Sequence, residues 1–236
     1  MIRSILFGSL VVVTLTLLLG VTFSPLIVSH AQPGQQIVGC WEPSDDYTRQ
    51  WVNGVQLNTR TLAMLDHAQT LYDAGGGVLD FRLGLTQGSY NAGGVAASFG
   101  THDAGGAVDL SVRSPLNWEV MTDEIEPMIH ALRIAGFAAW LRDTDELYPG
   151  SVIHIHAIAI GDAELSEAAR AQIDGRFGYL RGYNGLPQMD GNPIPDRYGG
   201  PIICDWMIAR GFVDMRGLPN PYPTPGGTTI PLWPIP

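Results

Sequence analysis

Hydrophobic residues recur at two different spacings along this chain. A spacing of three to four positions predicts three helices, over residues 59–74, 118–135 and 165–173. Asn58 or Thr59 can cap the first of them, and Gly75–Gly77 end it. Alternating or unbroken apolar positions predict four extended segments, over residues 78–90, 107–112, 137–142 and 152–160. This mixed order favours an α+β fold, a small antiparallel sheet with helices packed on it.

An uncharged, largely apolar run from Ile5 to Val28 follows Arg3 at the N-terminus. A short positive start, an apolar stretch and the small residues of Ser29-His30-Ala31 are typical of a secretory signal peptide, so we expect residues 1–31 to be removed. The run is also long enough to cross a bilayer, and the alternative is that it stays as an N-terminal membrane anchor. In both cases the rest of the chain is expected to be secreted or extracytoplasmic.

Beyond the leader, the chain divides by composition into four segments. A polar N-terminal extension covers residues 32–58, and its Trp41 and Trp51 are expected to pack against the domain. Most of the predicted helices and strands lie within residues 59–174. Glycine and tyrosine accumulate over 175–217, and a proline-rich tail, 218–236, is expected to be extended or disordered.

Charge excludes several classes of function. Acidic residues outnumber basic ones, 23 to 13, and the formal net charge is −10. This excess argues against a nucleic-acid partner, because that binding depends on neutralising phosphates. Every basic residue is arginine, so a lysine Schiff base and a Walker-type phosphate-binding loop are excluded. Nothing in the pattern predicts the oligomeric state.

The chain has two cysteines, Cys40 and Cys204, one toward each end. In an oxidising compartment their simplest use is a disulfide that ties the N-terminal segment to the C-terminal one. The alternative is a pair of unpaired buried thiols. Neither cysteine belongs to a metal-binding pattern such as CxxC.

Two short segments gather residues of the kinds that bind metals. In one, His102 leaves the glycine-rich loop 91–106, and Asp109 follows seven positions later on a predicted strand. In the other, His154 and His156 are two apart on a strand and therefore point to the same face. Three imidazoles and one carboxylate suit Zn²⁺, and a catalytic zinc needs three protein ligands, which leaves one group for proton transfer. The remaining histidines beyond the leader, His67 and His130, lie in predicted helices and are interpreted as ordinary helical residues.

The pattern His102-x-x-Gly105-x-Ala107-x-Asp109, followed by His154-x-His156, resembles the signature of the D-alanyl-D-alanine metallopeptidases. The wider group also includes lysostaphin-type endopeptidases and the Hedgehog signalling domain, and the resemblance covers about half the chain, from residue 59 to 173. It implies a Hedgehog- or DD-peptidase-like fold. It further implies that His102, Asp109 and His156 bind zinc and that His154 is the catalytic acid–base.

The chain departs from this family at three places. Gly100 occupies a position that is often serine, and Ile153 lies where many members have a glutamate base. The family's arginine for the substrate carboxylate is missing from the stretch 86–91, and Arg82 is the nearest arginine. We therefore expect the substrate-facing edge to be formed by a small set of residues, Arg82, Gln87, Ser89 and Tyr90.

The resemblance implies a zinc-activated water that cleaves peptide bonds in peptidoglycan stem peptides or other peptides. The enzyme would be of the D-Ala-D-Ala carboxypeptidase or the peptidoglycan endopeptidase type. One alternative is a catalytically inactive, zinc-bearing module that binds a peptide or protein, as in Hedgehog. Another is an interaction protein in which the metal is purely structural, with four protein ligands rather than three.

Overall fold

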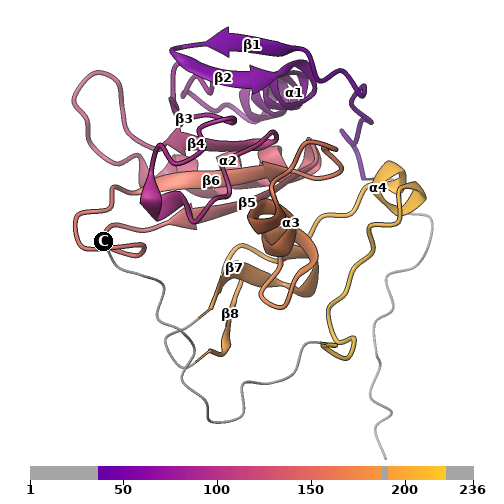
Figure 1. Ribbon diagram of the computed structural model, residues 1–236. Coiled ribbons are helices and arrows are strands. Elements are labelled where there is room, and N and C mark those ends of the chain that lie inside the picture. Colours follow the sequence, from indigo (N-terminus) through magenta and orange to yellow (C-terminus); the bar gives the residue numbers. More distant parts are fainter. Residues whose placement is uncertain (1–36, 188–190, 222–236) are drawn as a thin grey trace, which may run out of the picture. The chain divides into compact units, whose positions relative to one another are not determined.

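A computed structural model describes residues 37–187 and 191–221 of the chain (Figure 1). The predicted leader, 1–31, and most of the predicted tail lie outside the described residues. In chain order the elements are β1 (Arg49–Val52), β2 (Val55–Asn58), α1 (Thr59–Ala74), β3 (Leu85–Gln87), η1 (Ala96–Ser98), β4 (Ala107–Ser111), α2 (Thr122–Ile134), β5 (Phe137–Arg142), β6 (His154–Ala159), α3 (Glu167–Asp174), η2 (Tyr179–Arg181), β7 (Tyr183–Pro187), β8 (Pro193–Pro195) and α4 (Asp205–Ala209).

Four of these strands form an antiparallel sheet in the order β3-β4-β6-β5. The register places Asp109 of β4 opposite His156 of β6, and His156 opposite Trp140 of β5. One row further along, His154 lies opposite Arg142. Because residues two apart on a strand share a face, all of these side chains project from the same side of the sheet.

The two faces of the sheet are covered by different elements (Figure 1). On one face, β4, β5 and β6 contribute apolar residues to a core shared with α1 and α2. On the other, a smaller core joins the sheet to α3, η2 and α4. The polar side chains of Asp109, His154 and His156 lie on this same face, beside the smaller core. The architecture is α+β with small antiparallel sheets, as predicted.

The first predicted helix matches α1 in both bounds. Of the two proposed caps, Asn58 is the one that forms: its side-chain oxygen accepts a hydrogen bond from the Thr61 N–H at 2.8 Å. Gly75 follows the last helical residue. Leu65 and Ala68, at the predicted apolar positions, are fully buried. Local signals were sufficient here because the cap, the spacing and the stop all agree.

The predicted disulfide is present. Cys40 and Cys204 are bonded, with their Cα atoms 5.7 Å apart and 164 positions between them in sequence. Cys204 is buried in the smaller core, so the bond fastens the N-terminal segment to the elements that cover the second face of the sheet. A disulfide fits an extracytoplasmic protein. Among the residues that the structure describes, no helix is both long and apolar enough to span a membrane.

Two local predictions are wrong. The segment 78–90 is not extended throughout: residues 81–84 form a turn, in which the Gly84 N–H donates to the Asp80 carbonyl, and only 85–87 are a strand. Of the two N-terminal tryptophans, Trp41 packs edge-on against His67 of α1, with 5.6 Å between the ring centroids, whereas Trp51 is 73% exposed and does not act as an anchor. Trp51 lies on β1, which pairs with β2 alone and leaves that side chain without a covering layer.

Candidate metal centre

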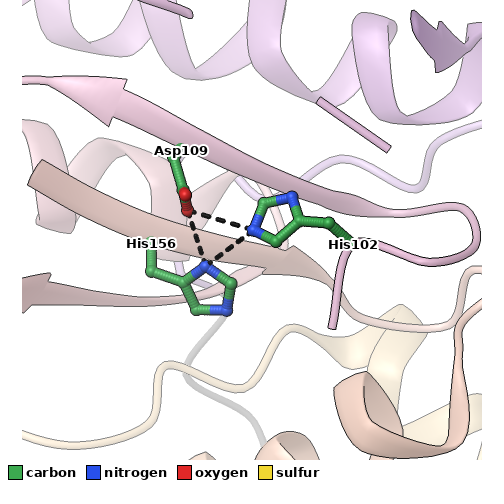
Figure 2. A group of neighbouring side chains, drawn as sticks. All are labelled: His102, Asp109 and His156. Carbon is green, nitrogen blue, oxygen red and sulfur yellow. Dashed lines mark hydrogen bonds and ion pairs between the residues drawn. The ribbon is translucent and has the colours of Figure 1, made fainter. Parts of the chain in front are cut away.

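Three potential metal ligands converge on one face of the sheet. Asp109 on β4 and His156 on β6 are cross-strand partners, so their side chains project next to each other. His102 reaches them from the loop that precedes β4. Figure 2 shows the two rings and the carboxylate pointing toward one another. All three residues are buried, and one ligand atom from each lies within 4.8 Å of the others.

The loop 91–106 is held so that His102 points back to the strand. The Asn91 N–H donates to the His102 carbonyl at 2.8 Å, and the Gly105 N–H donates to the carbonyl of Glu164 at 2.7 Å. Gly106, the residue before β4, has a φ of +82°, and a Cβ there would lie 2.5 Å from a Leu165 side-chain atom. Only glycine suits this position, which explains part of the glycine pattern in the sequence.

Each histidine of the cluster is oriented by a contact on its far side. The Nδ1–H of His102 donates to the carbonyl of Gly88 at 2.9 Å, and this leaves Nε2 facing Asp109. The His156 ring stacks on Trp140, with 6.1 Å between the ring centroids and 13° between the planes. Its Nδ1 faces Asp109, whereas its Nε2 is buried and has no hydrogen-bond partner within the described part of the chain.

The distances between the three ligand atoms suit a small tetrahedral ion. Asp109 Oδ1 lies 2.7 Å from His156 Nδ1 and 3.2 Å from His102 Nε2, and the two nitrogens are 3.3 Å apart. In a tetrahedral zinc site with metal–ligand bonds of about 2.0–2.1 Å, ligand atoms are separated by about 3.3 Å. Two of the three separations already have this value. The third is a hydrogen bond that metal binding would replace.

The negative charge of the buried Asp109 carboxylate is stabilised by the two imidazoles next to it. Burial raises the pKa of Asp109, but the two imidazoles, His102 above all, more than offset this and hold it well below its usual value. Burial lowers the pKa of His102, yet the Asp109 carboxylate outweighs it and the net shift is upward. Burial lowers the pKa of His156 to about 4. Without metal, the Asp109 carboxylate therefore favours a proton on His102, whereas burial favours the neutral form of His156.

His154, the expected acid–base residue, lies beside this cluster rather than in it. Its Nδ1–H donates to the carbonyl of Val152 at 2.7 Å, which frees Nε2 to face the site. Nε2 lies 3.7 Å from Asp109 Oδ2, and the side chain is 15% exposed, more than either of the other two histidines. His102, Asp109 and His156 are therefore the three candidate ligands, and His154 is a neighbouring imidazole that solvent reaches.

The cluster opens into a cavity of about 330 Å³. Its lining includes His102, Asp109, His154 and His156, together with apolar side chains such as Phe99 and Trp118. Among the described lining residues, Asp109 is the one carboxylate. A pocket that combines apolar side chains with several converging polar and ionisable groups suits a polar ligand.

Of the four residues expected at the substrate-facing edge, Gln87 alone lines this cavity. Its side-chain amide donates to the Ser98 hydroxyl at 2.7 Å, which ties β3 to the loop above the site. Ser89 is 2% exposed, and its hydroxyl donates to the carbonyl of Ala107 at 2.9 Å. Ser89 therefore supports the backbone next to β4 and does not reach the cavity.

Arg82 and Tyr90 also lie away from the cavity lining. Arg82 is half exposed and forms an ion pair with Asp66 of α1, at 2.6 Å, because the turn at residues 81–84 directs it toward that helix. The Tyr90 hydroxyl donates to a carboxylate oxygen of Glu164, and the guanidinium of Arg49 lies 3.9 Å from the centre of its ring. Both residues are committed to contacts that stabilise neighbouring segments.

Sequence reasoning missed most of the cavity lining, including the side chains of Arg113, Arg142 and Gln172. Arg142 ends the predicted strand 137–142, and its even number places it on the face of Trp140. The alternation along the strand predicts that Arg142 and Trp140 share a face. It does not show that this face carries His154 and His156 until the pairing of β5 with β6 is known. Gln172 lies on α3, and nothing in the local pattern predicts where that helix packs.

The chain was also compared with known proteins. No protein-family model matches it, no curated protein matches it, and no solved structure matches it.

Proposed function

We propose that this protein is an exported zinc metallopeptidase that cleaves peptide bonds in bacterial cell-wall peptides. The observation that carries the proposal is the buried cluster of His102, Asp109 and His156, which line an open cavity. Two histidines and one carboxylate provide the three protein ligands that a catalytic zinc uses. These three residues would hold the zinc ion, which would supply the Lewis-acid chemistry that activates water and polarises a peptide carbonyl.

The chain's own contribution is to orient groups and move a proton. His154 Nε2 is directed at the site by the Nδ1–H bond to Val152, and it can accept a proton from the attacking water and return it to the departing amine. Without metal, Asp109 Oδ1 holds both imidazoles, and with metal bound the same three atoms would be the ligands.

The substrate class follows from the resemblance to D-alanyl-D-alanine metallopeptidases and from export. An extracytoplasmic peptidase of this kind meets the stem peptides of peptidoglycan, and it acts either as a carboxypeptidase or as an endopeptidase. The disulfide supports export, because such bonds persist in oxidising compartments.

A second candidate function is a zinc-bearing module that binds a peptide or protein without cleaving it. One observation favours it: Ile153 stands at the family's glutamate position, and the described cavity lining holds no carboxylate except Asp109. Catalysis then depends on His154 alone. A purely structural metal is less well supported, because three side chains converge in the described cluster and closed structural sites use four.

The test is to incubate the purified protein with muropeptides, with zinc or with a chelator. We expect cleavage that needs zinc, with release of a terminal D-alanine for a carboxypeptidase and an internal cut for an endopeptidase. His154→Ala should lower turnover by about 10²- to 10⁴-fold while zinc stays bound. His130→Ala, an exposed histidine on α2, is the matched control and should keep full turnover.

The outcomes separate the candidates. Zinc binding without cleavage of any muropeptide in any variant would support the binding module. Cleavage that persists in His154→Ala would remove that residue from the mechanism. A chain that takes up no zinc would exclude both functions.

A further inference from the structure

One aromatic side chain of the cavity lining, Trp118, is left largely in water. It is 71% exposed, more than any other large hydrophobic side chain of the described lining. Its backbone has a φ of +63°, in the left-handed region that glycine adopts freely and bulky residues rarely enter. An exposed ring on a strained backbone adds little to folding, and residues of this kind gather at binding sites.

Trp118 is carried on a turn that is braced by hydrogen bonds. Arg113 and Val120 pair across the turn as an isolated antiparallel bridge. The Ser114 N–H donates to the carbonyl of Glu119 at 2.9 Å, and the Trp118 N–H donates to the carbonyl of Ser114 at 3.0 Å. Arg113 Nη1 donates to the carbonyl of Trp118 at 2.8 Å. Because the turn is already ordered, less conformational entropy is lost when a ligand binds to the ring.

The turn continues the strand that carries part of the metal centre. Asp109 and Ser111 of β4 share a face, and Arg113 follows two positions further along. Four positions of extended chain span about 13 Å, so about this distance separates Asp109 from the base of the turn. The same length corresponds to about four residues of an extended peptide ligand. A ligand group on Trp118 is therefore several residues away from a bond held at the metal centre.

The surroundings of Trp118 suit a group that is apolar on its face and polar at its edge. Ser111 and Arg113 line the cavity just before the turn, and Thr86 and Gln87 line it from β3, the strand next to β4. Within the described part of the chain, Arg113 uses one of its five N–H groups, in the bond to the Trp118 carbonyl. A purely apolar ligand group would take water from these polar side chains and give them no partner in return.

We propose that Trp118 is a stacking platform for a pyranose ring of a carbohydrate that the ligand carries. The axial C–H groups of a pyranose form an apolar face that packs on an aromatic ring. Its edge carries hydroxyl groups, and acetamide groups in amino sugars, that exchange hydrogen bonds with side chains such as Arg113.

In the proposed reaction the sugar belongs to the glycan strand to which a stem peptide is joined. Trp118 is then a specificity-determining residue that selects peptides still attached to glycan. The choice of an N-acetylated amino sugar rests on the proposed function, whereas the platform rests on the exposure, the strain and the bracing of the turn.

The experiment measures binding of a free saccharide to the purified protein in the presence of a chelator, so that neither zinc nor turnover is needed. The probe is triacetylchitotriose, which has three linked N-acetylglucosamine rings. The comparison probe is N-acetylleucinamide, which offers an apolar side chain instead. Dissociation constants are taken from NMR chemical-shift titrations. We expect saturable binding of the saccharide, and binding of the leucine probe that is at least about tenfold weaker.

Variants at two equally exposed tryptophans locate the contact. Trp118→Ala should weaken saccharide binding by about tenfold, through loss of the stacked ring, and Trp118→Tyr should restore most of it. Trp51→Ala is the matched control, because Trp51 is 73% exposed, lies on β1 and does not line the cavity. It should bind the saccharide as the wild-type protein does.

Trp118→Gly separates binding from folding. Glycine adopts a φ of +63° without strain, so this variant should keep or raise Tm while it loses the saccharide. A Tm that falls by several degrees together with saccharide binding would show that Trp118 supports the turn, and would overturn the inference.

Three other results would overturn it as well. They are no saturable saccharide binding to the wild-type protein, unchanged binding in both Trp118→Ala and Trp118→Gly, and Trp118-dependent binding of the leucine probe alone, which would assign the ring to an apolar peptide side chain. Failure of the proposed function is a separate result. A protein that binds the saccharide through Trp118 but takes up no zinc keeps the platform and loses the peptidase.

Discussion

Asp109→Asn tests the metal centre with very little change of shape. The carboxylate accepts from both imidazoles of the cluster, and the amide that replaces it is neutral and presents an NH₂ group in place of one oxygen. A ligand set of two histidines and one amide holds a divalent cation far more weakly. We therefore expect zinc to stabilise the wild-type protein against heat and to leave the Asn variant almost unaffected.

The size of the effect follows from mass action. At a free zinc concentration one hundred times the dissociation constant, binding to the native state adds about 2.7 kcal/mol to the free energy of unfolding. In a domain of about 150–250 residues, each kcal/mol raises Tm by about 2–4 °C, so the wild-type Tm should rise by about 5–11 °C. A hundredfold weaker site gains about 0.4 kcal/mol at the same zinc concentration, which shifts Tm by about 1–2 °C.

The assay is differential scanning calorimetry at pH 7.5, with zinc and with excess chelator. The matched control is Asp123→Asn, which removes an exposed carboxylate from α2 and should keep the full zinc-dependent rise in Tm. A rise of the same size in Asp109→Asn would refute the assignment of Asp109 as a ligand. No rise in the wild-type protein would refute the metal centre as a whole.

Two further predictions concern pH and the disulfide. In the metal-free protein, the Asp109 carboxylate keeps the pKa of His102 above its ordinary value, against the opposing effect of burial. His102 must lose the proton on Nε2 before that atom can bind metal. Zinc affinity, measured by competition with a chelator, should therefore fall by about tenfold per pH unit below this pKa and level off above it. A flat profile from pH 5 to 8 would contradict this. Replacing both Cys40 and Cys204 by serine opens a crosslink that spans 164 positions and should lower the free energy of unfolding in urea by about 5 kcal/mol, whereas an unchanged midpoint would show that the bond does not constrain the unfolded chain.

Much of the fold could be predicted from local signals. The helix α1 and the strand β5 have the expected bounds, because the apolar spacing, the cap and the flanking glycines of these elements agree. The elements after residue 174 were not foreseen: η2, β7, β8 and α4 are short, and glycine and proline within them hide any period. Their position is determined by contacts with the second face of the sheet, and such contacts leave no local pattern.

The sequence by itself determined which residues could form the metal centre. Two features can be read directly from short stretches of sequence. His154 and His156 are two apart on a predicted strand, and His102 and Asp109 flank a glycine-rich turn. The two cysteines, being a single pair, allowed one intramolecular pairing. Only the tertiary structure decided what surrounds that centre. It turned Arg82 and Tyr90 toward other partners, and it brought Arg142 and Gln172 to the cavity from β5 and α3. The physical reason is that periodicity reports which side of an element faces inward, whereas neighbours in space depend on strand register and helix docking between segments far apart in the chain.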